Sequence, residues 1–486
     1  MTVTMSLSIL HISDLHRDPE NPIGNEALLD SLENDCRRYT MEETPKVRSP
    51  DLIIVSGDII HGVRPDSLDA DELLREQYAE ALGFLNRLTE RLLEGDKRRV
   101  VVVPGNHDVS APHFFKSLQR IDIAPDRKKG LVERLFSRAS SLRWSWSDFE
   151  LYEIVNPGFY ARRLVAFSEF YRDFYEGLRT YSLNPSTQFD IFDFPEFNLT
   201  IAGFCSCYNN DIFNKQGDIH PDCICGAGMK LREPFYQNRL RVAVWHHNTE
   251  GLPLQSDYMD PDILQNLIDR GFSMGFHGHQ HRPQFLDTRF RHEGNRRITV
   301  ISAGTLCGGA SFRFGRAYNV VELDIEQLTG FLHLREMQND NLQLPIWGRR
   351  SLPPNDGSYL EFRFDPPPEP MVRTESGTTA LIEAQKLYDK GEFREAAKIL
   401  AGVAQSEELA RRLLLDCFGQ LDDMLSVISH FDPPTSSTEA IYLLEALWKE
   451  GKHERLLQLL DEPIIASSSD PSVVEMRNKY ALRLRK

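Results

Sequence analysis

The sequence predicts an α/β domain followed by an all-α domain, and three observations support this prediction. In residues 5–108, short apolar runs alternate with longer segments of helical periodicity, which is the wiring of an α/β fold. Prolines gather in residues 351–373 and predict an extended linker, and residues 374–486 show only helical spacing. The length of 486 residues also exceeds what one hydrophobic core usually supports, so we expect at least two domains.

Predicted strands dominate the first 350 residues. Each is an apolar run bounded by polar or turn-forming residues, and in order they are residues 9–12, 52–55, 100–103, 199–205, 242–245, 272–276, 297–302 and 317–325. Residues 69–94 show amphipathic periodicity and predict a long helix between the second and third strands. We therefore assign residues 1–350 to one α/β domain.

Residues 109–198 interrupt this domain and are rich in aromatic residues. Between Gly158 and Tyr181 the aromatic residues recur at helical spacing, which predicts a helical insertion. An aromatic stripe of this kind usually packs against a core, and we favour that interpretation. The alternative is a platform on which nucleic-acid bases stack.

Residues 374–486 predict a short stack of helical hairpins. Three glycines each follow a predicted helix, at intervals of 28 and 32 residues: Gly391, Gly419 and Gly451. The first stretch, with Ala384 and Leu387 ahead of its glycine, is similar to a tetratricopeptide unit, and a plain helical bundle is the alternative. Because no cluster of catalytic residue types occurs here, we expect this domain to dock a protein partner.

Charge and composition narrow the class of protein. The net charge of −16 argues against broad, non-specific binding to nucleic acid, which depends on Lys and Arg. No apolar stretch approaches the roughly 20 residues of a membrane span, so we expect no membrane association. Residues 1–5 lack the basic start of a secretory signal, which predicts a cytoplasmic protein.

Four of the seven cysteines form two Cys-x-Cys pairs: Cys205, Cys207, Cys223 and Cys225. Structural zinc sites usually have about two to four residues between paired cysteines, so this spacing is short. We favour reduced, partly buried thiols and keep a structural zinc site as the alternative.

Five polar clusters each follow a predicted strand: Asp14-Leu15-His16, Gly57-Asp58, Gly105-Asn106-His107-Asp108, His246-His247 and Gly278-His279-Gln280-His281. The strands would deliver these side chains to one edge of a sheet. Imidazole, carboxylate and one amide oxygen form a ligand set that suits manganese, iron or zinc rather than calcium. The sequence therefore predicts a site for two divalent metal ions.

The order and spacing of the clusters resemble the calcineurin-like metallophosphoesterases, whose signatures run D-x-H, G-D, G-N-H-[DE], H and G-H-x-H. The resemblance covers about residues 5 to 330. It implies a two-sheet sandwich flanked by helices. It also implies one metal on Asp14, His16 and His281, a second on Asn106, His246 and His279, and Asp58 as the bridge between them. His247 leaves a choice in the fourth motif, and we favour His246 because it directly follows the strand.

The resemblance implies hydrolysis of a phosphate ester. Two dications that share Asp58 and one hydroxide lower the pKa of water and neutralise charge on the phosphoryl oxygens. His107 would protonate the leaving oxygen, and Asp108 would fix the tautomer of His107. We interpret His247 and His11 as supporting or packing residues.

Within this class we favour phosphodiesters of nucleotides or nucleic acid as substrates. The reasons are the aromatic insertion and a group of arginines that would guide a phosphate backbone: Arg282, Arg289, Arg291, Arg296, Arg297, Arg313 and Arg316. A solvated hairpin face explains the arginines equally well. The alternatives are a protein phosphatase and a metal-binding interaction protein without turnover.

Overall fold

The computed structural model describes residues 6–122, 128–137, 140–251, 257–289, 296–310, 314–351, 357, 359–367, 375–404, 408–468 and 470–484. The chain divides into two compact units, Met1–Glu369 and Pro370–Lys486.

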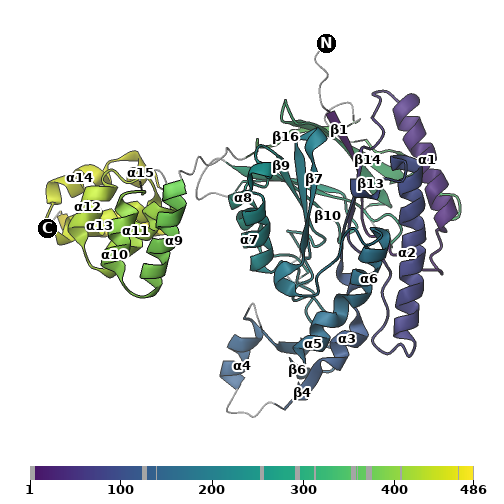
Figure 1. The fold of residues 1–486 in the computed structure, drawn as a ribbon, viewed down its shortest axis with the longest axis horizontal. Coiled ribbons are helices and arrows are strands. Elements are labelled where there is room, and N and C mark those ends of the chain that lie inside the picture. Colours follow the sequence, from purple (N-terminus) through teal and green to yellow (C-terminus); the bar gives the residue numbers. More distant parts are fainter. Residues whose placement is uncertain are drawn as a thin grey trace. The chain divides into compact units, whose positions relative to one another are not determined.

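Two mixed sheets form the first unit (Figure 1). The strands of the first sheet are β1 (Ser6–Ile12), β2 (Leu52–Ser56), β3 (Val100–Val103), β13 (Ala317–Asp324), β14 (Thr329–Met337), β15 (Trp347–Arg349) and β16 (Leu360–Arg363). They lie in the order β15-β14-β13-β1-β2-β3, with β16 also paired to β14. The strands of the second sheet are β7 (Phe189–Phe194), β8 (Leu199–Phe204), β9 (Leu240–Val244), β10 (Met274–His277), β11 (Gln284–Arg289) and β12 (Arg297–Ser302). Their order is β11-β12-β10-β9-β8-β7.

Each sheet contains a block of neighbouring parallel strands, at one end of the first sheet and in the middle of the second. Strands β1, β2 and β3 run in one direction in the first sheet, and β8, β9, β10 and β12 do so in the second. Parallel strands covered on both faces are apolar throughout, which explains their near-continuous Val and Ile runs. The loops that follow parallel strands emerge at one edge, so this topology brings distant parts of the sequence together.

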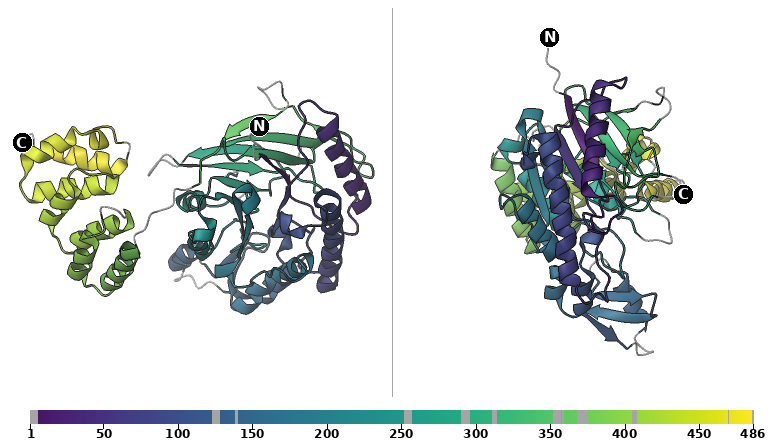
Figure 2. Two further views of the ribbon diagram at one scale, coloured as in Figure 1. Left: turned by 45° about the horizontal axis from the view of Figure 1, so that its top comes forward. Right: turned by 90° about the vertical axis from the view of Figure 1, so that its right-hand side faces the viewer.

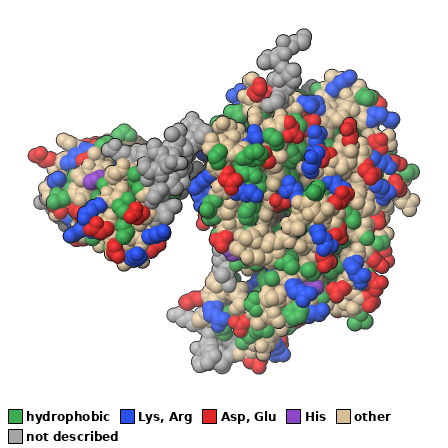
Figure 3. Space-filling model, in the orientation of Figure 1, with side chains coloured by type: hydrophobic (Ala, Val, Ile, Leu, Met, Phe, Trp, Pro, Cys, Tyr) green, Lys and Arg blue, Asp and Glu red, His purple; other side chains and the backbone are tan. Residues whose placement is uncertain are grey.

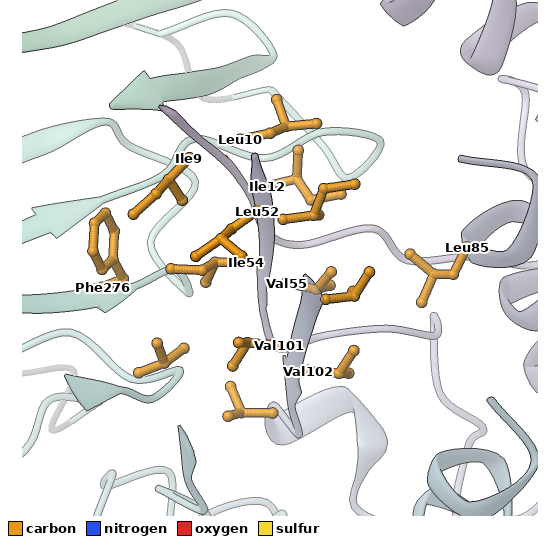
Figure 4. Close-up of a cluster of buried hydrophobic side chains, with 14 of the residues drawn as sticks. Ile9, Leu10, Ile12, Leu52, Ile54, Val55, Leu85, Val101, Val102 and Phe276 are labelled. Atoms are coloured by element: carbon orange, nitrogen blue, oxygen red, sulfur yellow. The ribbon is translucent and has the colours of Figure 1, made fainter. Parts of the chain in front are cut away.

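The main hydrophobic core fills the space between the sheets. Ile9, Ile54 and Phe276 are fully buried in it, and Figure 4 shows Phe276 facing the other two across the sandwich. Leu85 lies on the opposite side of the same strands. Burying one such side chain stabilises the fold by about 1.5–3 kcal/mol. The predicted two-sheet sandwich is confirmed.

Helices cover the outer faces of the sandwich (Figures 1 and 2). The helices beside the first sheet are α1 (Asn25–Met41) and α2 (Ala70–Leu93). The helices on the second sheet are α7 (Pro221–Lys230) and α8 (Pro261–Asp269), which share a second buried cluster with its strands. None of the helices in the described residues has the length and apolar character that a membrane span requires.

The insertion contains a small sheet as well as the predicted helices. Its helices are α3 (Ala111–Lys116), α4 (Lys128–Leu135), α5 (Pro157–Ala161) and α6 (Val165–Phe174). Its strands are β4 (Leu118–Ile121), β5 (Leu142–Ser145) and β6 (Glu150–Ile154), in the order β4-β6-β5. The helices agree with the prediction of a helical insertion. The small sheet was not predicted, because strands of four or five residues are too short to produce a readable alternation.

The aromatic stripe of the insertion packs against the core. Phe167, Phe170 and Phe174 of α6 are buried, and the Phe170 ring stacks on Tyr78 of α2. Tyr175 is also buried and donates a hydrogen bond to the Val100 carbonyl at 2.7 Å. The packing interpretation is confirmed, and these rings offer no free faces to a base.

The second unit consists of helices in its described part. They are α9 (Glu375–Asp389), α10 (Phe393–Ala401), α11 (Glu408–Gln420), α12 (Met424–Phe431), α13 (Ser437–Lys449), α14 (His453–Leu460), α15 (Pro463–Ala466) and α16 (Pro471–Leu484). Short turns at Gly391 and Gly451, both with positive φ, join α9 to α10 and α13 to α14. The all-α prediction is confirmed, and the likeness to tetratricopeptide units stays a prediction.

The segment 351–373 is not a linker throughout. Strand β16 lies within it and pairs with β14, and Phe362 and Phe364 are 6% and 2% exposed in the main core. The prolines after residue 365 obscured this strand, because its four residues carry too little pattern to stand out beside them.

The position of β16 yields a prediction about truncation. We expect a fragment ending at Glu369 to stay folded, and a fragment ending at Arg350 to lose several kcal/mol of unfolding free energy. Removing a buried Phe side chain costs about 3–5 kcal/mol, and the shorter fragment loses two. Urea unfolding of both fragments measures the difference. Equal unfolding midpoints would show that β16 contributes nothing to the core.

Candidate metal centre

The five predicted motifs meet in one place, because each follows a strand of one of the two parallel blocks. Backbone hydrogen bonds join the loops directly: Asp14 N donates to Gly57 O at 3.1 Å, and His16 N donates to Asp58 O at 3.0 Å. Within the second sheet, Gly278 N donates to His246 O at 3.0 Å, and His279 N joins the two sheets by donating to Asp14 Oδ2 at 3.1 Å. The loops therefore form one connected assembly rather than separate turns.

The backbone is strained where it carries these side chains. Five non-glycine residues of the motifs have positive φ: Asp14, His16, Asp58, His279 and His281. Each such residue costs on the order of 1–3 kcal/mol, and strain of this kind clusters at functional sites. Gly57 also has positive φ, and a Cβ there would lie 2.4 Å from His246 Nδ1.

Asp14, His16 and His281 form the first cluster. His16 Nε2 and His281 Nε2 lie 3.3 Å apart, and His281 Nε2 is 3.2 Å from Asp14 Oδ1. Asp14 Oδ1 is buried without a hydrogen-bond donor in the described structure. A buried carboxylate oxygen that faces two imidazole nitrogens fits a cation, so these residues suit a metal ion.

Asp58, His246, His279 and Asn106 form the second cluster. Asn106 Oδ1 lies 2.8 Å from His279 Nδ1 and 3.1 Å from His246 Nε2. His246 Nε2 is also 3.2 Å from Asp58 Oδ2. One amide oxygen, one carboxylate and two imidazoles thus converge, which is again a ligand set for manganese, iron or zinc.

Asp58 lies between the two clusters. Its Oδ2 atom is 3.2 Å from His246 Nε2 and 3.9 Å from His16 Nε2, while its Oδ1 atom accepts a hydrogen bond from His107 N at 2.8 Å. This position suits a carboxylate shared by two ions. Asn106 stands only in the second cluster, as the family pattern implies.

Burial and the neighbouring carboxylates set the protonation of the imidazoles. Burial lowers the pKa of His16 and His279 to about 4, which keeps both rings in the neutral form that binds metals. Burial alone would also lower the pKa of His246, but the Asp58 carboxylate raises it to about 9. The Asp58 carboxylate therefore favours a positive charge at this cluster.

The geometry distinguishes His246 from its neighbour His247. His246 Nδ1 donates to the Ser56 carbonyl at 2.8 Å, which leaves Nε2 directed at the cluster. Both nitrogens of His247 are bonded elsewhere, Nδ1 to Ser206 Oγ at 2.8 Å and Nε2 to Asn210 Nδ2 at 3.1 Å. His247 is thus a packing residue in this arrangement.

The predicted contact between Asp108 and His107 is wrong. His107 Nδ1 donates to the backbone carbonyl of His61 at 2.6 Å. Asp108 is buried and accepts hydrogen bonds from Gly105 N, Ile59 N and Tyr78 Oη. Burial raises the pKa of Asp108 to about 7. Asp108 therefore stabilises the loop of the third motif. The group that orients His107 is the main-chain carbonyl of His61, which no side-chain pattern could predict.

Other supporting groups also escaped the sequence analysis. The carbonyls of Ser56 and Gly309 accept from His246 Nδ1 and His281 Nδ1, at 2.8 and 2.7 Å. Such acceptors fix the ring orientation of metal-binding histidines. No side-chain pattern identifies a carbonyl, so the sequence carried no signal for them.

Sequence comparison agrees with this geometry. Residues 7–283, more than half of the chain, match the profile of the family described as calcineurin-like phosphoesterase. The chain belongs to that family. Among curated proteins, none matches the chain.

Several solved structures are also similar to this chain. A dimetal phosphatase from Danio rerio is 10% identical, with 70% of this chain and 98% of that chain covered and a TM-score of 0.36. The calcineurin-like phosphoesterase YfkN from Bacillus subtilis is 12% identical, with coverages of 74% and 90% and a TM-score of 0.29. Vps29 from Chaetomium thermophilum is 8% identical, with coverages of 74% and 100% and a TM-score of 0.22. At these scores the likeness supports no conclusion about substrate.

The paired cysteines do not form a second metal site in the described residues. Cys205, Cys207 and Cys223 are buried, whereas Cys225 is exposed. Cys223 Sγ donates to the Pro185 carbonyl at 3.1 Å. In the described part of the chain, the groups of His, Cys, Asp and Glu that suit a metal all lie at the centre and contain no cysteine.

The contrast between His246 and His247 yields a prediction. Both side chains are fully buried, so replacing either by Ala opens a similar cavity. We expect His246→Ala to lower the metal content by about one ion per chain, whereas His247→Ala retains both ions. Mass spectrometry of the purified, dialysed proteins measures the metal. Equal metal loss in the two variants would contradict the assignment.

Proposed function

We propose that this family member hydrolyses phosphate esters with two divalent metal ions held by Asp14, His16, Asp58, Asn106, His246, His279 and His281. The observation that carries the proposal is the position of Asp58 between two complete ligand clusters. When bound, two such ions activate water and neutralise charge on the phosphoryl oxygens. Manganese, iron and zinc all suit this ligand set.

His107 supports turnover rather than simple metal binding. Because Nδ1 donates to the His61 carbonyl, Nε2 is the nitrogen left to act at the centre, and it lies 4.0 Å from Asp58 Oδ2. The side chain is 38% exposed, so a substrate can reach it. A protonated Nε2 there would donate to the leaving oxygen as the ester bond breaks.

A cavity of about 620 Å³ adjoins His107 and suits the leaving group. Its walls come from the loop after β2, from α2 and from the insertion, and its lining includes His61, Val63, Arg64, Leu73, Glu76 and Ile212. The volume lies in the usual range for pockets that bind compact organic molecules. We therefore propose a compact alcohol, such as a nucleoside, as the leaving group.

The aromatic insertion and the group of arginines were the two reasons to expect nucleic acid as a substrate. Neither is supported for an extended nucleic acid. The rings of the insertion stripe are buried, and Arg296 and Arg297 bond to Pro366 O and to the Asp365 carboxylate rather than lining the centre. The side chains of Arg289, Arg291 and Arg313 lie outside the described residues. On the face drawn in Figure 3, acidic and basic side chains are interspersed. We therefore favour nucleotide phosphodiesters over DNA or RNA, with a phosphoprotein as the competing substrate.

The helical second unit is proposed to bind a protein partner. Leu409, Leu425 and Leu457 are exposed on α11, α12 and α14 and would supply apolar contacts to a partner. A fragment ending at Glu369 separates the two roles, because it retains every proposed metal ligand.

The proposed hydrolysis is tested with a panel of substrates. We expect the full chain with added Mn²⁺ to cleave an aryl phosphodiester and nucleotide diesters, and to cleave phosphopeptides and single-stranded DNA more slowly. Asp58→Asn should lower turnover by several orders of magnitude, because it removes the shared carboxylate. Chelation should abolish activity and added metal should restore it. A chain that binds metal and cleaves none of these substrates would be an interaction protein without turnover.

The role of His107 is tested with leaving groups. We expect His107→Asn to retain metal and to lose about 10²- to 10⁴-fold in kcat on an alkyl ester, which needs a proton on its leaving oxygen. An activated aryl ester, whose leaving group departs as an anion, should lose much less. Steady-state kinetics on both esters measure the effect. Equal losses on the two esters would exclude His107 as the acid.

A further inference from the structure

One peptide unit controls how His107 is oriented. The His61 carbonyl accepts the hydrogen bond from His107 Nδ1 at 2.6 Å. The N–H of Gly62 belongs to the same planar peptide unit, and in a trans peptide it points away from that carbonyl. Whatever holds the Gly62 N–H therefore also fixes the carbonyl that His107 uses.

Gln77 of α2 holds this peptide unit. Its Oε1 atom accepts from Gly62 N at 2.9 Å, and its Nε2 atom donates to Gly62 O at 3.2 Å. The Gln77 Nε2 atom also donates to Asp18 Oδ2 at 2.6 Å. Because a carboxylate oxygen only accepts, this bond identifies which end of the Gln77 amide is the nitrogen and which is the oxygen. Gln77 is only 5% exposed and sits on a 24-residue helix packed against the core, so it is a rigid anchor.

The loop needs such an anchor because Gly62 gives it freedom. Gly62 has φ of +83°, and a Cβ at this position would lie 2.9 Å from the His107 carbonyl oxygen. Glycine permits this close approach, but it also allows the peptide to rotate more easily than any other residue would. The two hydrogen bonds between the Gln77 side chain and the Gly62 N–H and C=O restrict this rotation of the backbone.

We propose that Gln77 is a positioning residue of the phosphoesterase reaction, which holds the His61–Gly62 peptide so that His107 presents Nε2 to the metal centre. The inference rests on the proposed function. Gln77 itself contacts none of the seven proposed metal ligands in the hydrogen bonds of the described structure. Gln77 and Gly62 also line the cavity beside His107, so a direct effect on substrate binding should appear in KM. The positioning effect should appear in kcat, pass through His107 and leave metal binding intact.

A double-mutant cycle tests this inference. We expect Gln77→Leu to lower kcat on an alkyl ester by about 10- to 100-fold, a part of the usual contribution of general-acid catalysis, and to change kcat on an activated aryl ester by less than about 3-fold. In the His107→Asn background, Gln77→Leu should cause no further loss on either ester, because the residue through which it acts is gone. Metal content should equal that of the wild type.

Two further variants keep the test decisive. Gly62→Ala disturbs the same peptide without touching α2, so it should show the same dependence on the leaving group and the same lack of additivity with His107→Asn. Thr89→Val removes a buried hydrogen bond elsewhere on α2, from Thr89 Oγ1 to Leu85 O, and should affect stability without changing the ratio of alkyl to aryl turnover.

The possible failures are distinguishable. Equal losses on both esters, additive losses in the double variant, or lost metal would overturn the role of Gln77 and leave the proposed function intact. A wild-type chain that cleaves neither ester under any of the three metals would overturn the proposed function and this inference together. If Gln77→Leu does not fold, Gln77→Met, which keeps the length of the side chain and loses the hydrogen bonds to Gly62, is read by the same outcomes.

Discussion

Two buried carboxylates, Asp14 and Asp58, impose the constraint on which the rest of the site depends. They are 0% and 2% exposed, and a buried anion without compensation costs several kcal/mol. Backbone N–H groups from other motifs supply part of the compensation: His279 N donates to Asp14 Oδ2 at 3.1 Å, and His107 N donates to Asp58 Oδ1 at 2.8 Å. Imidazoles, and the cations proposed here, supply the rest. Each carboxylate therefore ties two loops together, and the strained backbone of the motifs persists because these bonds hold it in place.

Helix α2 links this constraint to the hydrophobic core. Its apolar face, including Leu85, packs on the first sheet, and the same helix presents Gln77 and Tyr78 to the motif loops. Tyr78 Oη donates to Asp108 Oδ1 at 3.0 Å, and Asp108 in turn accepts from the backbone of Gly105 and Ile59. Packing energy thus fixes the position of groups that act on the second and third motifs. A shift of α2 would move both loops, although none of the proposed ligands lies on it.

The features that could be predicted from the sequence are those that depend on the type and spacing of side chains. Apolar runs predicted eight strands of the two sheets and missed β7, β11, β14, β15 and β16. The ordered motifs placed seven polar residues that the structure brings together. The errors have physical causes. Strands β4, β5, β6 and β16 are only four or five residues long, so their pairing depends on partners distant in the sequence rather than on local pattern. The orientation of His107 depends on the His61 carbonyl, and main-chain groups are the same at every position. Asp108 is adjacent to His107 in the sequence, but its carboxylate bonds to Gly105 N, Ile59 N and Tyr78 Oη rather than to His107.

The aromatic insertion shows why the substrate was harder to predict than the chemistry. A stripe of rings at helical spacing suits a base-stacking surface and a core-facing helix equally, and only the contact with α2 decides between them. The metal centre draws its residues from strand ends shared across the family. The cavity beside His107 is built from different parts, the loop after β2, α2 and the insertion residues Val109 and Ala111. Under the proposal that this cavity receives the leaving group, selectivity in this chain should follow the loop and the insertion rather than the motifs.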